Sequence, residues 1–413
     1  MFFQPVWDSL HLQTEDDMIG FHTLAVPGPT NMPYAIRQAM DVALEDHRAP
    51  DFPDFVKPLL RDLKSVFRTQ DGRVFLFPGS GTAGWEAAIG NCLSPRDMVL
   101  TSTFGQFSGL WVDMCRRFNL NVKNFDLDWG EGVPLDLYRR LLEDDRHHRI
   151  KAVLACHNET ATGVTSDIAG IRKILDDLGH PALLFVDGVS SIGAIDFRMD
   201  EWGVDIAVAG SQKGFMLPTG LCIVGVSSKA MDACARSGNA SCYLDFQDMA
   251  KANDQGYFPY TPAATLMRGL RASVDMLMDE GLDNVVARHA RLAGGVRAAV
   301  DAWGLRNCAR RPELFSDTVT AVMVDASMNA NDIIGAAYNE FGVSLGGGLG
   351  KVAGKVFRIG HLGWLNEAMV LQALGGAELA MRHCGVPFEA GAGVGAAIDH
   401  FTTSREALPL AAE

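Results

Sequence analysis

Short, uninterrupted apolar runs recur along this chain, and helical patterns fill the intervals between them. The runs lie at Val74–Phe77, Met98–Leu100, Ala152–Ala155, Leu183–Val186, Ile206–Ala209 and Leu221–Val224, with helical patterns at Trp85–Cys92, Leu110–Phe118 and Ile168–Leu178. Runs that are apolar throughout are typical of strands buried on both faces, as in parallel sheets covered by helices. The alternation therefore predicts an α/β fold built on a mostly parallel sheet with helices on both sides.

The pattern changes after about Pro262. A long helical stretch is expected from Leu270 to Val300, followed by short strands at Val319–Val324 and Val356–Ile359. A chain of 413 residues has room for one large and one smaller domain. We predict an N-terminal arm over residues 1–24, a large domain over residues 25–278 and a smaller α+β domain over residues 279–413.

Composition narrows the class of protein further. The net charge of −14 argues against nucleic-acid binding, which needs basic patches. No apolar run approaches the roughly 20 residues that span a bilayer, and residues 1–17 lack the features of a secretory signal. None of the eight cysteines has the spacing of a zinc site, and several lie in apolar segments, as expected in a reducing compartment. The sequence therefore predicts a soluble cytoplasmic protein without a metal site, a nucleic-acid partner or a membrane anchor.

Two of the expected strands end beside chemically active side chains. Asp187 directly follows the apolar run that ends at Val186, and Lys213 follows the next run within Gly210-Ser211-Gln212-Lys213. Ligands bind at the carboxyl ends of strands in α/β sheets. An amine there can form a Schiff base with an aldehyde, and a carboxylate can keep a pyridine nitrogen protonated. The pair therefore indicates pyridoxal 5′-phosphate (PLP), whereas each residue alone would suit a surface lysine or a turn-capping aspartate.

The segment Gly79-Ser80-Gly81-Thr82-Ala83-Gly84 joins an expected strand to an expected helix. Small residues let the backbone approach a phosphate, and the helix N-terminus offers free N–H groups. The segment lacks the lysine of a nucleoside-triphosphate loop. Its glycine spacing suits a dinucleotide as well as a small phosphate-bearing cofactor.

Four further features each allow two interpretations. His157 suits a general base or a structural histidine, and Phe107 suits a ring stacked on a flat cofactor or a core residue. Arg358 lies within an apolar strand and suits a substrate carboxylate or an internal salt bridge. The run from Gly346 to Gly350 suits a flexible lid or a plain turn.

Taken together, these segments resemble the class V aminotransferases of PLP-dependent fold type I, and most closely the serine–glyoxylate and alanine–glyoxylate enzymes. The likeness runs from about Val26 to Ala397 and implies a mostly parallel seven-stranded sheet in the large domain. It rests on the strings Val26-Pro27-Gly28-Pro29-Thr30, Glu45-Asp46-His47-Arg48, His157-Asn158-Glu159-Thr160-Ala161-Thr162-Gly163-Val164, Asp187-Gly188-Val189-Ser190-Ser191, Gly210-Ser211-Gln212-Lys213, Tyr257-Phe258-Pro259-Tyr260-Thr261-Pro262 and Gly354-Lys355-Val356-Phe357-Arg358-Ile359-Gly360-His361.

The resemblance implies a role for each matching position. Lys213 matches the Schiff-base lysine, and Asp187 matches the partner of the pyridine nitrogen. The other implied cofactor contacts are Ser80, Gly81, Thr82 and Gln212 at the phosphate, Phe107 on the ring and Thr160 at the ring oxygen.

Substrate and subunit contacts are implied in the same way. Arg358 matches the binder of the substrate α-carboxylate. Thr261 with a nearby tyrosine, Tyr257 or Tyr260, matches a segment that reaches the cofactor phosphate of the other subunit. His47 and Arg48 match a segment that enters the partner's active site, so the resemblance implies a homodimer with shared sites.

The implied reaction is ping-pong transamination of an L-amino acid, preferably L-serine, with glyoxylate to give hydroxypyruvate and glycine. Thr82 and Phe107 stand where mammalian alanine–glyoxylate enzymes have histidine and tryptophan, which moves the chain toward the serine type, although Trp364 stands where a small or polar residue is usual. L-Aspartate and L-alanine are alternative donors, and Arg48 would serve a second carboxylate.

A PLP-dependent lyase such as a cysteine desulfurase is disfavoured, because residues 309–383 contain no cysteine.

Overall fold

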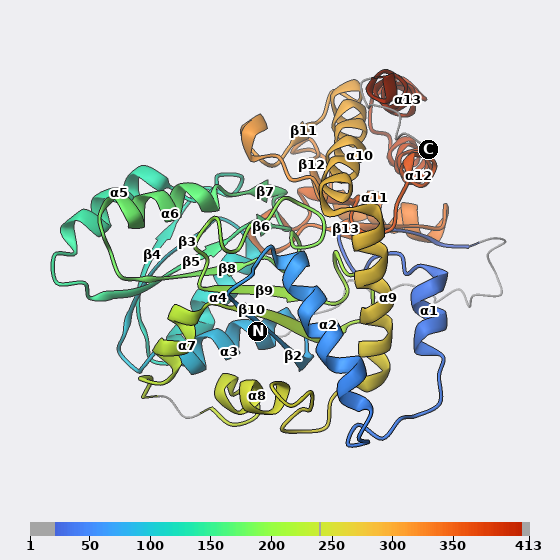
Figure 1. Cartoon of the computed structure of the whole chain (residues 1–413). Coiled ribbons are helices and arrows are strands. Elements are labelled where there is room, and N and C mark those ends of the chain that lie inside the picture. The colour runs from blue at the N-terminus through green and yellow to red at the C-terminus, as the bar shows by residue number, and fades with distance from the viewer. Residues whose placement is uncertain (1–20, 239–240, 407–413) are drawn as a thin grey trace.

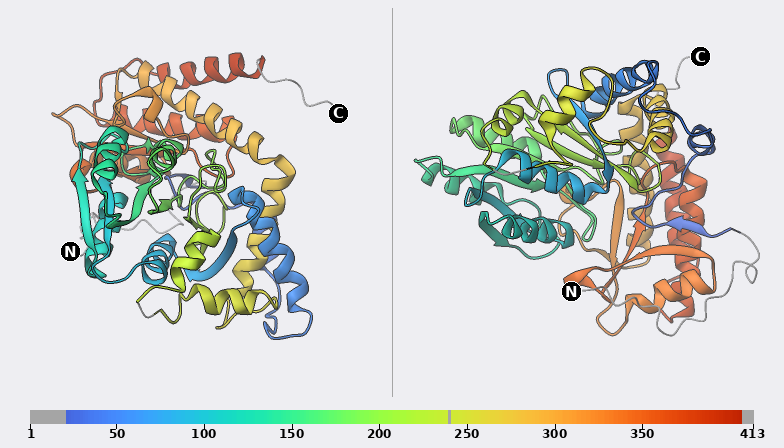
Figure 2. Two further views of the ribbon diagram at one scale, coloured as in Figure 1. Left: turned by 60° about the vertical axis from the view of Figure 1, so that its left-hand side comes forward. Right: turned by 90° about the horizontal axis from the view of Figure 1, so that it is seen from below.

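The computed structural model describes residues 21–238 and 241–406, so most of the predicted N-terminal arm lies outside the described residues. Within them the chain forms a seven-stranded sheet, a five-stranded sheet and a two-stranded hairpin of β6 (Asn158–Glu159) and β7 (Val164–Thr165). Figure 1 shows the seven-stranded sheet with its helices mainly in blue to yellow, and most of the five-stranded sheet in orange to red. Figure 2 shows the same separation from two further sides.

The seven-stranded sheet has the mostly parallel form that the apolar runs predict. Its strands lie in the order β2 (Arg73–Gly79), β10 (Gly220–Val226), β9 (Ile206–Gly210), β8 (Leu183–Asp187), β5 (Ile150–Cys156), β3 (Met98–Thr103) and β4 (Asn121–Asp126). β10 runs antiparallel to both of its neighbours, and the other pairs are parallel. The predicted α/β fold is therefore confirmed.

Alternate side chains of each strand enter two separate cores. One core contains Leu184 and Ala207 and is covered by α2 (Phe52–Phe67), α5 (Leu135–Asp144), α6 (Ile168–Asp177) and α9 (Ala264–Glu280). The other contains Phe185 and Val208 and is covered by α3 (Gly81–Cys92), α4 (Gln106–Arg117), α7 (Ser228–Cys234) and α8 (Phe246–Asn253). Because both faces are buried, the strands carry apolar side chains at successive positions.

The five-stranded sheet combines the two ends of the described chain. Its order is β1 (Thr23–Ala25), β13 (Val343–Gly347), β14 (Val356–Gly360), β12 (Val319–Met323) and β11 (Arg306–Asn307). β1 pairs in parallel with β13, and the other pairs are antiparallel. The core beside this sheet is formed with α10 (Leu282–Ala302), α11 (Ala330–Asn339), α12 (Glu367–His383) and α13 (Ala392–Glu406), whereas α1 (Tyr34–Met40) lies beside α9 (Figure 1). The predicted domain boundaries at residues 24 and 278 stay predictions.

Two glycine-containing segments differ from the sequence prediction. The expected continuous helix from Leu270 to Val300 is two helices, α9 and α10, which meet at Gly281. Gly281 has a φ of +81°, and a right-handed helix cannot continue through that conformation. The expected loop at Gly346–Gly350 is also partly wrong, because Gly346 and Gly347 belong to β13. A Cβ at Gly346 would lie 2.9 Å from Pro27 and 3.1 Å from Arg358, so glycine allows the close packing of this strand.

Candidate active site

The carboxyl ends of β5, β8 and β9 lie side by side in the seven-stranded sheet. Cys156 is paired with Asp187, and Asp187 with Val208, so the segments that follow these strands leave the sheet at one edge. The helices α3 and α4 begin just after β2 and β3, at the same edge. This arrangement brings the polar residues that follow separate strands to one site, as expected for an α/β sheet.

Lys213 lies in the turn after β9 and is half-buried. Its ammonium group donates a hydrogen bond to the carbonyl oxygen of Pro27. A Cβ on Gly28 would overlap the end of the Lys213 side chain, so glycine is required there. Burial and, to a smaller extent, the charge of Arg358 lower the pKa of Lys213 to about 8, although the charge of Asp187 acts in the opposite direction. The amine therefore loses its proton more readily than that of a surface lysine.

Asp187 is the last residue of β8 and is 5% exposed. Its Oδ1 accepts the Val189 N–H at 2.9 Å, and its Oδ2 accepts the Cys156 S–H at 3.6 Å. Burial and the charge of Glu159 together raise the pKa of Asp187 to about 6, although the hydrogen bonds from Val189 and Cys156 act in the opposite direction. The carboxylate would be stabilised by a cation at this position.

The glycine-rich segment surrounds the first turn of α3. Ser80 is the N-cap residue, but its side chain makes no capping hydrogen bond, and Thr82 is exposed. A Cβ on Gly81 would overlap Val189, so this turn packs directly against the segment that follows Asp187. The buried Oε1 of Gln212 has no hydrogen-bond partner among the described residues. The free hydroxyl, the helix N-terminus and the orphaned amide form a polar surface suited to an anion.

Phe107 and Thr160 belong to neighbouring segments joined by Glu159. Phe107 lies in the first turn of α4, and its N–H donates to Glu159 Oε1 at 3.3 Å. Thr160 directly follows Glu159 and is buried. Sequence reasoning did not single out Glu159 or Cys156. The available signal was their position at the carboxyl end of β5, because this is the edge of the sheet at which Asp187 also lies.

Arg358 is buried in β14 at 8% exposure, and it faces the site from the five-stranded sheet. Its Nε donates to the Gly347 carbonyl at 2.8 Å, and one Nη donates to the Thr160 carbonyl at 3.0 Å. Burial lowers the pKa of Arg358 to about 10, and the charge of Glu159 opposes the decrease. The guanidinium stays charged near neutral pH. It has no salt bridge with any carboxylate in the described residues, which leaves it free for an anionic ligand.

Four predicted site residues lie on other loops and make no hydrogen bond or ion pair with Lys213, Asp187 or Arg358 in the described chain. His47 and Arg48 lie between α1 and α2, and Arg48 is exposed. Tyr260 and Thr261 precede α9 and are both exposed, Tyr260 at 38%. Tyr257, the other candidate tyrosine, instead donates its hydroxyl to the Ala49 carbonyl at 3.2 Å.

Comparison with known proteins identifies the family. The family model of class-V aminotransferases matches residues 55–352. This chain belongs to the class-V aminotransferases. It is 58% identical to a serine–glyoxylate aminotransferase of Hyphomicrobium methylovorum over 92% of this chain and 94% of that protein. It is 53% identical to an L-aspartate–glyoxylate aminotransferase of Paracoccus denitrificans, over 93% and 97%. The solved structure of an alanine–glyoxylate aminotransferase from Nostoc sp. matches with a TM-score of 0.82 at 30% identity, over 90% and 98%.

Membership of this family implies PLP as the cofactor of this aminotransferase. The residues present fit that group. The buried Asp187 suits a protonated ring nitrogen, and the half-buried amine of Lys213 suits an aldehyde. The unpartnered Gln212 Oε1 and the uncapped first turn of α3 suit a phosphate. In the described part of the chain, no group of three or more His, Cys, Asp or Glu side chains is arranged to hold a metal ion.

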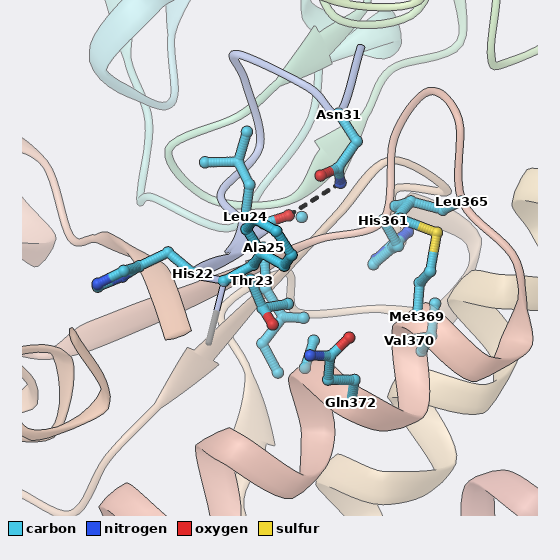
Figure 3. A pocket seen from close by; sticks show the side chains of 14 residues that line it. His22, Thr23, Leu24, Ala25, Asn31, His361, Leu365, Met369, Val370 and Gln372 are labelled. Carbon is cyan, nitrogen blue, oxygen red and sulfur yellow. Dashed lines mark hydrogen bonds between the residues drawn. The ribbon is translucent and has the colours of Figure 1, made fainter. Parts of the chain in front are cut away.

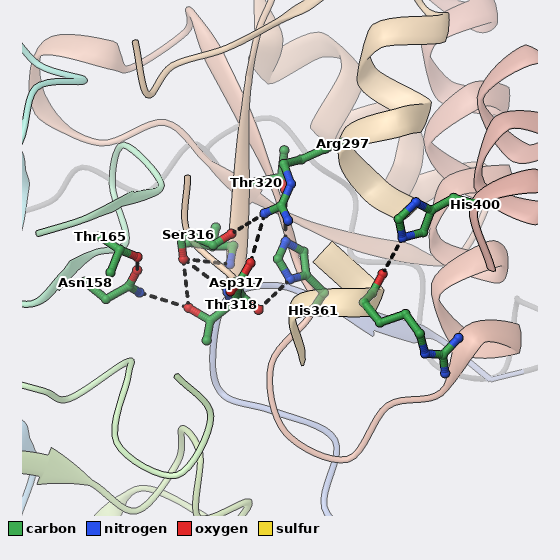
Figure 4. A network of polar contacts seen from close by, with 11 residues as sticks. Asn158, Thr165, Arg297, Ser316, Asp317, Thr318, Thr320, His361 and His400 are labelled. Atoms are coloured by element: carbon green, nitrogen blue, oxygen red, sulfur yellow. Dashed lines mark hydrogen bonds and ion pairs between the residues drawn. The ribbon is translucent and has the colours of Figure 1, made fainter. Parts of the chain in front are cut away.

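A polar network links the β6–β7 hairpin, which follows β5, to the five-stranded sheet of the aminotransferase (Figure 4). The Asn158 amide donates to Ser190 Oγ at 2.8 Å and to Thr318 Oγ1 at 2.9 Å. Thr318 directly precedes β12, and Asn158 begins β6. His157 directly precedes Asn158, and its Nδ1 forms a hydrogen bond with the Ser191 hydroxyl at 2.8 Å. Burial lowers the pKa of His157 to about 4. The geometry favours the structural interpretation of His157.

A cavity of about 250 Å³ lies between β1, the end of β14 and α12 (Figure 3). None of the predicted site residues lines it. His361 borders this cavity, and its ring nitrogens bond the Thr320 hydroxyl at 2.9 Å and the Asp317 carbonyl at 3.1 Å. Burial lowers the pKa of His361 to about 3, so its ring is neutral and held in place. This cavity is separate from the chemistry at Lys213.

Proposed function

We propose that this aminotransferase transfers the amino group of L-serine to glyoxylate, giving hydroxypyruvate and glycine. The observation that carries the proposal is the 58% identity to the serine–glyoxylate enzyme of Hyphomicrobium methylovorum across nearly the whole chain. The site geometry supports it, because Asp187 and Lys213 lie at one edge of the seven-stranded sheet and Arg358 faces them from the five-stranded sheet. Transamination of an α-amino acid requires each of these groups.

Lys213 and Asp187 carry the chemistry in this proposal. When bound, PLP supplies an aldehyde for the amino group and a cationic ring that withdraws electron density from the substrate Cα. Lys213 Nζ removes the Cα proton as a general base and then returns that proton as a general acid. Asp187 stays ionised beside the ring nitrogen and keeps that nitrogen protonated.

The remaining residues hold the cofactor. We assign phosphate binding to Ser80, Gly81, Thr82 and Gln212, ring stacking to Phe107 and hydrogen bonding of the ring oxygen to Thr160. Both half-reactions use this site in turn, so the kinetics are ping-pong.

Arg358 orients the substrate by its α-carboxylate. Because the amino acid and the keto acid share this carboxylate, Arg358→Ala should raise KM for both by about tenfold or more, the usual effect of losing a charged hydrogen-bond pair. Steady-state kinetics with each substrate varied in turn checks this. Unchanged KM values would remove Arg358 from the site.

The proposed donor is tested by comparing serine, alanine and aspartate with glyoxylate as the common acceptor. We expect the highest kcat/KM with L-serine. A higher kcat/KM with L-aspartate or L-alanine would overturn the donor assignment and leave the aminotransferase chemistry intact.

L-Aspartate is the second candidate donor, because a relative named for aspartate–glyoxylate transfer is 53% identical to this chain. Arg48 is exposed and would serve the second carboxylate. In that case Arg48→Ala should lower kcat/KM for aspartate and leave that for serine unchanged.

We also propose a homodimer in which His47, Arg48, Tyr260 and Thr261 complete the partner's site, with Tyr260 and Thr261 contacting the phosphate. The exposure of Arg48, Tyr260 and Thr261 in the single chain supports this arrangement, and so does the buried Nε2 of the half-buried His47, which has no hydrogen-bond partner among the described residues. A cytoplasmic location is proposed as well, on the basis of cysteines that are all free. Among the described helices, none has the length and apolarity needed to cross a membrane.

A further inference from the structure

We propose that Glu159 is a positioning residue that fixes both the ring-stacking side chain and the arginine that binds the substrate carboxylate. Glu159 is fully buried at the end of β6, and its side chain bonds the start of α4. The inference deepens the proposed function and rests on the roles proposed there for Phe107 and Arg358.

Both carboxylate oxygens of Glu159 are occupied by donors. Oε2 accepts the Ser108 N–H at 2.8 Å and the Ser108 hydroxyl at 3.0 Å. Oε1 accepts the N–H of Phe107 at 3.3 Å and that of Ala161 at 3.1 Å. The N–H groups of Phe107 and Ser108 belong to the first turn of α4 and have no partner within the helix. The helix dipole also favours a carboxylate at this end of the helix. Glu159 therefore fixes the position of the first turn of α4, which carries Phe107.

The same side chain holds Arg358 through one peptide group. The carbonyl of Thr160 accepts a hydrogen bond from Arg358 at 3.0 Å, and the N–H of that same peptide, which belongs to Ala161, donates to Glu159. The peptide is therefore fixed on both sides, by the arginine and by the carboxylate. Moving Glu159 would move the peptide that aims the guanidinium into the site.

The neighbouring sequence leaves room for this contact. A Cβ on Gly105 would overlap the carboxylate end of Glu159, so the approach of α4 to Glu159 requires glycine at its N-cap. Glu159 also acts on the site by its charge, because it favours the charged form of Arg358 and raises the pKa of Asp187. The buried carboxylate of Glu159 thus affects the position of Phe107, the position and charge of Arg358, and the pKa of Asp187.

The test is Glu159→Gln, which preserves the shape of the side chain. An amide offers a single acceptor oxygen, so its NH₂ group must face the donors at Phe107 and Ala161 or those at Ser108. We expect the dissociation constant of PLP from the cofactor-free protein, measured by equilibrium dialysis without any amino acid, to rise about tenfold to a hundredfold. KM for both the amino acid and glyoxylate should rise as well, because Arg358 loses its support.

The matched control is Asp145→Asn. Asp145 is also a buried carboxylate that accepts two backbone N–H groups, from Arg149 at 3.0 Å and Ile150 at 2.7 Å. Ile150 is the first residue of β5, so this carboxylate lies at the opposite edge of the same sheet from Lys213. Asp145→Asn should lower the melting temperature, yet leave the PLP dissociation constant and both KM values within about twofold of the parent protein.

Each outcome decides the assignment. If Glu159→Gln loses stability as Asp145→Asn does, but keeps PLP affinity and KM within about twofold of the parent, Glu159 is only structural and the proposal is wrong. If Glu159→Gln does not fold, Ser108→Ala takes its place. That variant removes one donor to Glu159 and should weaken PLP binding by about threefold to tenfold, whereas parental affinity would refute the proposal. A parent protein that binds no PLP would overturn the proposed function together with this inference.

Discussion

Asp187 holds its charge in an enclosed position that the cofactor-free protein stabilises poorly. Burial raises its pKa to about 6 from an ordinary 3.8, so between these pH values the folded chain binds a proton more tightly than the unfolded chain does. Protonated Asp187 therefore contributes to the free energy of unfolding. This contribution is fully present below the unfolded-state pKa and is lost as the pH rises through about 6. The loss at neutral pH is about 3 kcal/mol, and a cation bound beside Asp187 would offset it.

We therefore expect Asp187→Asn to raise the melting temperature of the cofactor-free protein at about pH 8. Asparagine can still accept the Val189 N–H, but it carries no charge. Toward about pH 4.5 the difference should shrink, because Asp187 is then largely protonated as well. Calorimetry of the two cofactor-free proteins across this range checks the prediction, and a difference that does not depend on pH would contradict it.

The amine of Lys213 reacts with an aldehyde only when it is uncharged, and its lowered pKa of about 8 brings that form close to neutral pH. The rate at which cofactor-free protein captures PLP should rise with pH and level off above about 8. Arg358→Met should move the midpoint upward, since it removes a positive charge that lowers the Lys213 pKa. Stopped-flow absorbance at a series of pH values measures both midpoints. Identical midpoints would mean that the charge of Arg358 does not reach Lys213.

Among the elements, the segment after β1 links the smaller sheet to the turn that carries Lys213. The Pro27 carbonyl accepts the Lys213 hydrogen bond, and the Thr30 N–H donates to the Gln212 carbonyl at 3.2 Å. Gly28 has a φ of +116°, and a side chain there would occupy the space of the lysine amine. The segment therefore depends on glycine for both its backbone conformation and its fit.

Gly28→Ala should slow the capture of PLP by the cofactor-free protein by about a hundredfold or more, because Lys213 must move away from its position. Gly179→Ala is the matched control, since Gly179 also has a positive φ, +58°, but a Cβ there would meet no atom within 4 Å. Both variants should lose roughly 1 kcal/mol or more of stability from backbone strain. If the two capture PLP equally well, the overlap with Lys213 has no functional effect.

The elements also show how far the sequence alone could lead. Uninterrupted apolar runs revealed β2, β5, β8 and β9, and the positions of Asp187 and Lys213 followed from where those runs end. The break at Gly281 was missed because apolar residues continue on both sides of it, and only the backbone angle ends the helix. Glu159 was missed because a carboxylate within a polar string looks solvated, and its burial depends on α4, more than 40 residues earlier in the chain.

At the scale of the whole molecule, the site draws on both sheets. Asp187 ends one strand of the seven-stranded sheet and Lys213 follows another, whereas Arg358 belongs to the five-stranded sheet. The Asn158 amide links the segment that follows β5 to Thr318, which precedes β12. The relative position of the two larger sheets therefore sets the distance between the amine of Lys213 and the guanidinium of Arg358. Tyr260 and Thr261 precede α9, are exposed, and form no hydrogen bond with Lys213, Asp187 or Arg358 in the described chain.

The proposed sharing of sites between subunits predicts complementation. Lys213→Ala and the double variant Tyr260→Phe/Thr261→Val should each have low activity as homodimers. When both are co-expressed, half of the dimers are hybrids, and each hybrid has one site with an intact Lys213 and an intact phosphate contact from its partner. Activity should then recover to about a quarter of the parental value. If Tyr260 and Thr261 instead serve the site of their own chain, the mixture would show no more activity than the two variants assayed separately and combined.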